Sequence, residues 1–255
     1  VLVVARAAAA TRAASSGVAA RSTLRTAPHR YKAVVVGGGV VGTSVLYHLA
    51  KLGWTDVALL ERKVLTAGSS WHAAGNFHAL NGDPTMSAMQ KYTMELYDDI
   101  ERESGQSCGV HYTGGVNIAS TAERWRWMRA EWARHRTLGI ESRLLTPAEC
   151  AELVPILPQP GDAAAAAAPP ILGGLFDPAE GTLDCSGVVT AYAKSAQRRG
   201  AHVEQHAMLE SMAPTGDGAW ALRVRVGSDG TGVGDAHGGA LVDVHAEHVV
   251  NAGGL

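Results

Sequence analysis

Residues 31–62 decide the fold, and they read YKAVVVGGGVVGTSVLYHLAKLGWTDVALLER. A short run rich in β-branched residues leads into three glycines, which are followed by a helical stretch and then by a second β-branched run. That order predicts a strand, a tight turn, a helix and a second strand. The stretch therefore predicts an α/β fold.

The glycines of this stretch have the spacing of a dinucleotide-binding turn. In Gly37-x-Gly39-x-x-Gly42, the first glycine permits the tight turn, the second lets a pyrophosphate approach the backbone, and the third lets the helix pack close to the sheet. The helix N-terminus then offers free N–H groups to the diphosphate. Glu61 ends the second strand, where its carboxylate is placed to accept hydrogen bonds from ribose hydroxyls. Together these residues predict a dinucleotide site.

The last residues, AEHVVNAGGL (246–255), indicate which dinucleotide is bound. They predict a strand from Glu247 to Val250 that ends in Asn251-Ala252-Gly253-Gly254. Small residues at a strand tip let the backbone come near a ligand. In two-domain flavoproteins a late strand returns to the nucleotide-binding sheet and ends in such a motif beside FAD. We therefore expect Gly253 to lie at the cofactor, and the cofactor to be FAD.

Composition excludes several other classes of protein. The chain has 255 residues, of which 46% are hydrophobic and 18% charged, enough for a substantial core. A formal net charge of -2 gives no electrostatic reason to expect nucleic acid as a partner. No apolar run approaches the length of a membrane span. The three cysteines, Cys108, Cys150 and Cys185, lack metal-ligand spacing, and we expect no metal site.

Residues 1–30 differ from the rest of the chain. They contain five arginines and many Ala and Ser, but no Asp or Glu, since the first acidic residue is Asp56. This pattern is typical of an organelle transit peptide. The alternative is a disordered tail translated from an upstream region. In either case we expect residues 1–30 to lie outside the fold.

Six separated stretches resemble one family of enzymes, the mitochondrial dimethylglycine and sarcosine dehydrogenases among the D-amino-acid-oxidase-like flavoproteins. They occur in the family's order: VVVGGGVVGTSVLYHLAKLGW (34–54), LLERKVLTAGSSWHAAG (59–75), GGVNIAS (114–120), LTPAECAELVPIL (145–157), DPAEGTLDCSGVV (177–189) and VVNAGG (249–254). One departure is Cys185, which stands where the family usually has proline.

The resemblance implies a doubly wound, Rossmann-type FAD-binding sheet with a helical excursion and the beginning of a sheet-based substrate domain. Residues 31–255 would form the N-terminal portion of the FAD-dependent oxidoreductase domain. Helices are expected over 85–104, 121–138 and 186–199. Residues that bind substrate and handle protons are expected downstream of Leu255, so no catalytic residue is assigned.

The resemblance also assigns cofactor-binding residues. The diphosphate turn would be formed by Gly37, Gly39, Val40, Val41 and Gly42. The ribose contact would be Glu61 with Arg62, and Leu209 would contact the adenine side through its backbone. His72 falls on the family's covalent flavin histidine, whose imidazole nitrogen bonds to the flavin 8α-methyl carbon. A neutral imidazole is required for that attack, and neutral pH supplies it. The predicted residues are Gly37, Gly39, Val40, Val41, Gly42, Glu61, Arg62, Leu65, Thr66, Ala67, Gly68, Ser69, Ser70, Trp71, His72, Ala73, Leu209 and Gly253.

The implied function is oxidation of an N-methyl carbon of dimethylglycine or sarcosine in the mitochondrial matrix. The amine gives a hydride equivalent to FAD, and the iminium product is captured by tetrahydrofolate or water. The family passes its electrons to an electron-transfer flavoprotein. The residues that would separate dimethylglycine from sarcosine are expected further along the protein.

Two alternatives stay open. A D-amino-acid or glycine oxidase would share the FAD motifs and use oxygen, although the Trp71-His72 loop argues against it. The regulatory subunit of pyruvate dehydrogenase phosphatase resembles the same family without being an enzyme, and it is expected to lack the tether histidine. His72 is thus the discriminating residue, and it favours the enzyme.

Overall fold

The structure is a computed structural model that describes residues 24, 29–78, 81, 83–158, 169–227 and 239–254. The described residues fall into two compact units. The nucleotide-binding unit contains Val18–Gly75, Leu96–Val110 and Leu183–Leu255, and the second unit contains Asn76–Glu95 and His111–Thr182. Among the described residues, no helix has both the length and the apolar composition that crossing a membrane requires.

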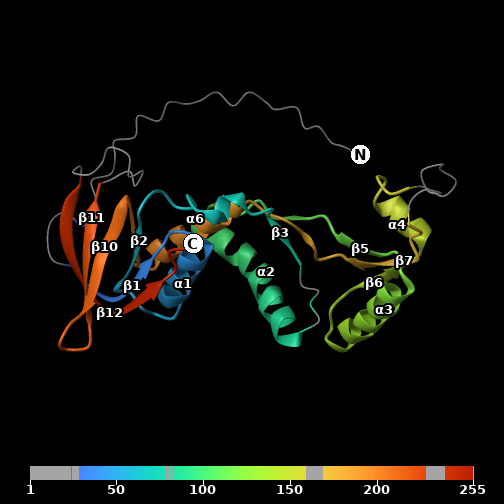
Figure 1. Cartoon of the computed structure of the whole chain (residues 1–255), viewed down its shortest axis with the longest axis horizontal. Helices are drawn as coiled ribbons and strands as arrows, with labels where there is room; N and C mark the ends of the chain where they lie inside the picture. Colours follow the sequence, from blue (N-terminus) through green and yellow to red (C-terminus); the bar gives the residue numbers. More distant parts are fainter. Residues whose placement is uncertain are drawn as a thin grey trace, which may run out of the picture. The chain divides into compact units, whose positions relative to one another are not determined.

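A six-stranded sheet forms the centre of the nucleotide-binding unit (Figure 1). The strands β9, β2, β1 and β12 pair in parallel, whereas β12, β11 and β10 pair antiparallel as a meander. The sheet order is β10-β11-β12-β1-β2-β9. Its strands are β1 (His29–Val36), β2 (Val57–Glu61), β9 (His202–Gln205), β10 (Ala207–Pro214), β11 (Trp220–Val226) and β12 (Ala240–Asn251).

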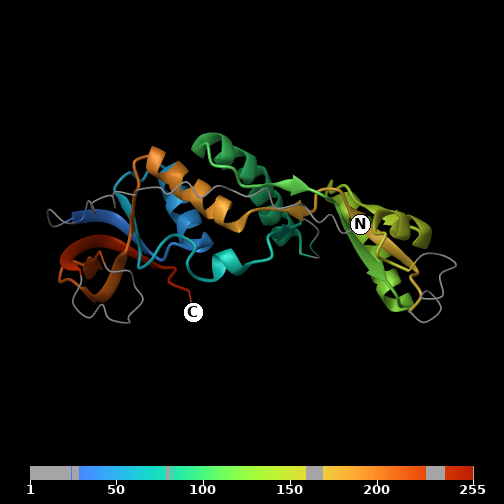
Figure 2. The same cartoon turned by 90° about the horizontal axis from the view of Figure 1, so that it is seen from above.

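Apolar layers cover the sheet on both faces, which explains why Ala33, Val34 and Val35 are all buried in β1. On one face lie α1 (Val40–Lys51) and α6 (Cys185–Arg198), side by side in Figure 2. The C-terminal turns of α2 (Pro84–Ser104) join the same core. The meander supplies the second layer, because Leu222, Val224 and Val226 pack with Val34 and Ala58. The predicted FAD-type α/β sheet is confirmed. The face opposite α1 and α6 is covered by the meander instead of helices.

Two strands are longer than the sequence predicted. β1 begins at His29 rather than Tyr31, because His29 and Arg30 pair with Val244 and His245 of β12. β12 begins at Ala240 rather than Glu247, because its first half alternates buried and exposed residues and pairs with β11. The predicted boundary at residue 30 therefore cuts into the sheet. Most of the leader lies outside the described residues, so its role as a transit peptide stays a prediction.

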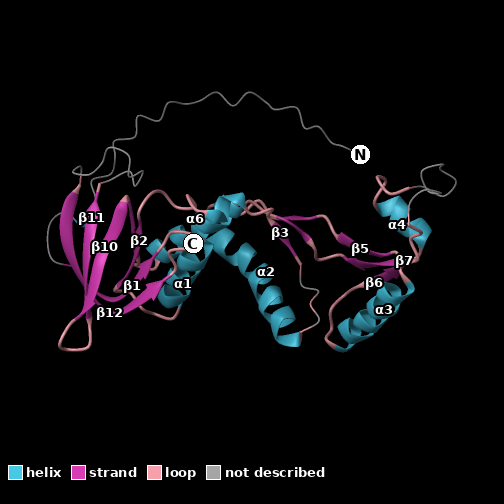
Figure 3. Cartoon of the chain, viewed as in Figure 1, coloured by secondary structure: helices cyan, strands magenta, loops and turns pink. Residues whose placement is uncertain are grey.

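Among the described residues, the second unit contains two small antiparallel sheets, two complete helices and the first part of α2, up to Glu95 (Figure 3). The helix α3 (Ala122–Thr137) packs Met128 against Ala119 and Leu175 of the larger sheet. The helix α4 (Pro147–Leu153) begins with a capping box between Thr146 and Glu149. The sheets are β3-β8-β4 (Asn76–Phe77, Gly181–Thr182, His111–Tyr112) and β5-β7-β6 (Gly115–Ala119, Gly173–Asp177, Arg143–Leu145). All three predicted helices are confirmed to within one residue at each end.

Candidate flavin site

The glycine turn between β1 and α1 is so tight that a side chain on Gly37 or Gly42 would collide with a backbone oxygen. Gly37 has a φ of +111°, and a Cβ on it would lie 2.2 Å from the carbonyl oxygen of Ala252. A Cβ on Gly42 would lie 1.9 Å from the carbonyl oxygen of Gly37. Gly39 differs, because its Cβ would meet only the Ser70 hydroxyl, at 3.1 Å. Gly37 and Gly42 thus serve the fold, whereas Gly39 leaves the backbone open to a ligand.

Glu61 joins the end of β2 to this turn. Its Oε2 accepts the Gly38 N–H at 2.7 Å, and its Oε1 accepts the Lys63 N–H at 2.7 Å. A carboxylate has about four acceptor positions, so these two bonds leave capacity for two hydroxyls. The half-buried carboxylate fits the predicted ribose contact.

Backbone hydrogen bonds fix the first half of the loop after β2. The Leu65 N–H donates to the side-chain oxygen of Gln205 at 2.8 Å, and the Thr66 N–H donates to the Gly38 carbonyl at 3.0 Å. Thr66 takes a φ of +70°, which β-branched residues rarely adopt. Such a conformation costs on the order of 1–3 kcal/mol and clusters at ligand sites.

His72 ends a short 3₁₀ helix, η2 (Ser69–His72). Its ring is exposed and lies 4.0 Å, centroid to centroid, from the ring of Trp71. Its Nδ1 lies 3.3 Å from the carbonyl oxygen of Gly68. Because a carbonyl can only accept, this contact requires the proton on Nδ1, which in a ring with one proton leaves the lone pair on Nε2. The structure thus presents an exposed imidazole next to residues that line the cavity.

A cavity of about 340 Å³ lies over the glycine turn, a volume typical of ligand pockets. Of the predicted residues, those that line it are Gly37, Gly39, Val40, Val41, Glu61, Arg62, Ala67, Gly68, Ser69, Ser70, Ala73 and Gly253.

The other predicted residues do not line the cavity. Gly42 packs beneath the turn, Leu65 and Thr66 belong to the hydrogen-bonded part of the loop, and Trp71 and His72 follow the lining residues directly. Leu209, in β10, packs against the meander core, and its predicted contact with adenine stays a prediction.

Four lining residues were not predicted: Gly38, Lys63, Ala252 and Gly254. Each adjoins a predicted one in the sequence, so extending the glycine turn, the Glu61-Arg62 pair and the strand tip by one residue would have found them. The cavity meets the carboxyl ends of β1, β2 and β12, where open α/β sheets bind their ligands. Free N–H groups, small residues and an acidic group for ribose together fit FAD.

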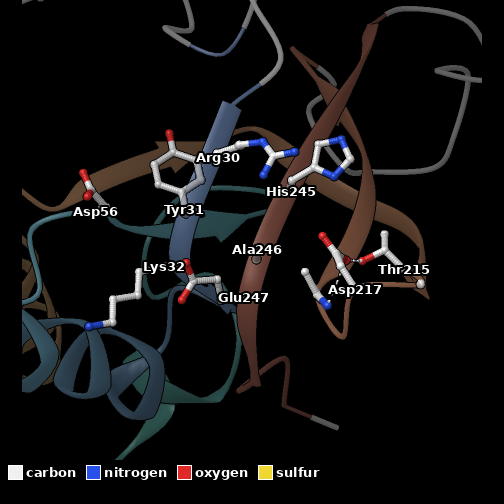
Figure 4. A pocket seen from close by; sticks show the side chains of 11 residues that line it. Arg30, Tyr31, Lys32, Asp56, Thr215, Asp217, His245, Ala246 and Glu247 are labelled. Atoms are coloured by element: carbon white, nitrogen blue, oxygen red, sulfur yellow. Dashed lines mark hydrogen bonds between the residues drawn. The ribbon is translucent and has the colours of Figure 1, made fainter.

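A second, larger hollow of about 430 Å³ lies at the amino end of β1 (Figure 4). Arg30, Lys32, His245 and Glu247 line it, and the turn at Asp217 closes one side. None of the predicted cofactor residues lines it. It stands at the wrong end of the parallel strands for a nucleotide, and half of the side chains that line it are solvent-exposed. We therefore place the cofactor over the glycine turn.

The model of the family of FAD dependent oxidoreductases matches residues 32–255. The chain belongs to that family. The family uses FAD, the dinucleotide that the glycine turn and the strand tip at Gly253 together predicted.

Several curated proteins are similar to this FAD-dependent oxidoreductase. Rat mitochondrial dimethylglycine dehydrogenase is 33% identical over 226 residues, which are 89% of this chain and 24% of that protein. Human mitochondrial sarcosine dehydrogenase is 33% identical over 206 residues, 80% of this chain and 21% of that protein. The mitochondrial regulatory subunit of mouse pyruvate dehydrogenase phosphatase is 31% identical over 191 residues, 72% of this chain and 21% of that protein. The chain thus spans about a quarter of the length of these relatives.

Solved structures show the same fold. The glycine oxidase of Geobacillus kaustophilus superposes with a TM-score of 0.66 at 24% identity, over 89% of this chain and 56% of that one. The L-proline dehydrogenase of P. horikoshii superposes with a TM-score of 0.70 at 22% identity, over 89% of this chain and 53% of that one. At these identities the likeness concerns the fold alone.

Proposed function

We propose that this chain is the flavin-binding part of an amine dehydrogenase that oxidatively demethylates dimethylglycine or sarcosine. The observation that carries the proposal is His72, exposed on a turn that directly follows residues lining the cofactor cavity. Similarity to dimethylglycine and sarcosine dehydrogenases supports the substrate class. When bound, FAD would supply the acceptor for the hydride equivalent that leaves the N-methyl carbon.

We propose further that His72 holds the flavin covalently through Nε2. The hydrogen bond from Nδ1 to the Gly68 carbonyl orients the ring and keeps the proton on Nδ1. The lone pair on Nε2 is then the one that would bond to the 8α carbon. One proton would leave the methyl group and one the imidazole, the flavin ring would take up the two electrons, and the electron acceptor of the enzyme would reoxidise it. Gly68, Ser69, Ser70 and Ala73 add only small side chains to the cavity wall, which suits a flat ring.

The test is retention of flavin after denaturation. The full-length natural protein is saturated with FAD, precipitated with acid and digested with trypsin. We expect the precipitate to stay yellow and the peptide that spans Trp71 and His72 to carry the mass of the flavin. His72→Ala should release its flavin, whereas His78→Ala, which removes another exposed histidine outside the turn, should retain it. A wild-type peptide without flavin would remove the covalent bond from the proposal.

The substrate is tested by anaerobic reduction. Dimethylglycine and sarcosine are added separately, and bleaching of the flavin absorbance reports hydride transfer. We propose that an electron-transfer flavoprotein then reoxidises the cofactor and that tetrahydrofolate captures the one-carbon product. Faster reoxidation by dioxygen than by electron-transfer flavoprotein would favour an oxidase. Formaldehyde release that tetrahydrofolate does not suppress would contradict its role.

The second candidate is a regulatory subunit without enzymatic activity, since such a protein of mouse pyruvate dehydrogenase phosphatase matches 72% of this chain. It predicts FAD binding without a covalent bond and without reduction by either amine. The same two measurements therefore separate the candidates.

We also propose that the protein works in the mitochondrial matrix, because the similar dehydrogenases are mitochondrial proteins. The Arg-rich residues 1–30 would direct import. A fluorescent protein fused behind them should enter mitochondria, and Arg-to-Glu changes at Arg6, Arg12 and Arg21 should leave it in the cytosol. Diffuse fluorescence from the unchanged fusion would overturn the proposal.

A further inference from the structure

Ser70 supplies the cap that the nucleotide-binding helix lacks. The residue before α1 is Gly39, which has no side chain to accept the first free N–H groups of the helix. The Ser70 hydroxyl accepts the Val40 N–H at 2.9 Å from thirty residues further along the chain. A side chain of the flavin loop therefore occupies the position of an ordinary helix cap.

The open side of Gly39 makes this contact possible. The Ser70 oxygen is the only atom within 4 Å that a Cβ on Gly39 would meet among the described residues, at 3.1 Å. Gly39 thus admits both a ligand and the Ser70 hydroxyl to the same helix end.

The same residue holds the turn that carries His72. Trp71, His72, Ala73 and Ala74 are exposed, so burial does not fix this part of the loop. Hydrogen bonds fix it instead. The bond between the Val40 N–H and the Ser70 hydroxyl attaches the loop to α1 two residues before His72. After His72, two contacts join the loop to the segment at the start of α6. The Cys185 thiol lies 3.6 Å from the Ala73 carbonyl, and the Leu183 N–H donates to the Gly75 carbonyl at 2.8 Å.

The hydroxyl still has a proton to donate. A serine hydroxyl has one donor and two acceptor positions, and the Val40 N–H uses one acceptor position. Within the part of the chain that the structure describes, the Ser70 hydroxyl donates to no other group. It lines the cavity at the end of α1, where a diphosphate oxygen would be the natural acceptor.

We propose that Ser70 is a positioning residue that couples diphosphate binding to the presentation of His72. Its oxygen binds the helix N-terminus, its proton binds the diphosphate, and its backbone holds the turn that ends in the imidazole. The inference rests on the proposed covalent attachment and explains how docking of the nucleotide would align the nucleophile. Ser120 is the control, because it follows β5 in the second unit and does not line the cavity.

The experiment measures the rate of covalent flavin incorporation against FAD concentration in the full-length natural protein. We expect Ser70→Ala to slow incorporation by about tenfold or more even at saturating FAD, the loss of one charge-assisted hydrogen bond. Ser70→Thr, which keeps the hydroxyl, should restore most of the rate, and Ser120→Ala should behave as wild type. A Ser70→Ala rate equal to wild type at saturating FAD would overturn the proposal, as would an equal loss in Ser120→Ala.

A second measurement needs no flavin. Amide hydrogen exchange of the flavin-free protein should become faster at Val40 and across residues 68–74 in Ser70→Ala, and stay unchanged at these positions in Ser120→Ala. Unchanged exchange in Ser70→Ala would overturn the positioning role. If wild type binds FAD but never retains it through denaturation, the covalent attachment fails, and with it the coupling to His72. A loss of incorporation rate that is confined to Ser70→Ala supports both the covalent attachment through His72 and the positioning role of Ser70.

Discussion

The carboxylate of Glu61 accepts the backbone N–H of Gly38 at 2.7 Å, so the end of β2 holds the glycine turn that follows β1. The other carboxylate oxygen accepts the Lys63 N–H at the same distance. Glu61 therefore shapes the site before any nucleotide binds, and because it lines the cavity, its remaining acceptor positions are available for the predicted ribose contact.

Replacing Glu61 should affect both the turn and the nucleotide. A hydrogen bond to a charged group contributes about 1.5–3 kcal/mol, so Glu61→Ala should weaken FAD binding by about tenfold or more. It should also lower the melting temperature of the flavin-free protein, because Gly38 and Lys63 lose their acceptors. FAD affinity is measured by flavin fluorescence in a His72→Ala background, where no covalent bond hides the effect.

Glu103 provides the control for this prediction. It pairs with Arg199 on the surface, away from the cavity, and Glu103→Ala should leave FAD affinity unchanged. If Glu61→Ala lowers the melting temperature but not the affinity, Glu61 serves only the glycine turn.

The sequence predicted the glycine turn and Glu61 because their chemistry is local. A tight turn requires Gly37 and Gly42 wherever the rest of the chain goes, and a terminal acid on β2 lies beside that turn in any parallel βαβ unit. The helices were equally predictable from their apolar spacing and caps. The site residues that the sequence missed, such as Lys63 and Ala252, have side chains with no diagnostic chemistry of their own.

Contacts between distant segments could not be predicted in the same way. The bond between Val40 and Ser70 joins residues thirty positions apart, and nothing in either side chain specifies the other. The meander was missed for a similar reason. In the first half of β12, Val244 and Ala246 are more buried than their neighbours because they belong to the core that β11 helps to form. This alternation in burial depends on β11 and not on the local sequence. Tertiary packing, rather than local preference, sets these elements.

Alanine at two glycines should separate folding from cofactor binding. In Gly42→Ala the new methyl group would meet the Gly37 carbonyl oxygen at 1.9 Å, so the helix must move from the sheet. We expect a loss of 1–3 kcal/mol or more in unfolding free energy, the usual effect of overpacking. In Gly39→Ala only the Ser70 hydroxyl is near, at 3.1 Å, so the fold should persist while FAD affinity falls.

Urea unfolding of the flavin-free proteins and FAD titration in a His72→Ala background check this pair. Gly216→Ala is the control for a glycine in open space, because no atom lies within 4 Å of its Cβ position and its φ, like those of Gly39 and Gly42, is not in the left-handed region. Equal loss of stability in Gly39→Ala and Gly42→Ala would contradict the division of roles.

Tyr31 should make the fold sensitive to alkaline pH. Its hydroxyl is hydrogen-bonded to Nδ1 of His202 at 2.6 Å, and burial, with a smaller contribution from Glu204, raises its pKa to about 12. An unfolded tyrosine has a pKa near 10. Because the folded pKa is the higher one, this contribution to stability is fully present below pH 10 and is lost as the pH rises from about 10 through 12. The Cys108 thiol, whose pKa burial also raises to about 12, adds a similar loss that begins near pH 9.

Tyr31→Phe isolates the contribution of the phenol, since Cys108 stays in both proteins. The unfolding free energy is measured in urea from pH 8 upward. Between pH 8 and 9 the wild type should be the more stable protein by about 1 kcal/mol, the net value of the lost hydrogen bond. Above pH 10 the wild type should lose stability faster, so that the difference narrows. A difference that stays constant to the highest pH at which both proteins fold would show that the Tyr31 hydroxyl titrates alike in the folded and unfolded chains.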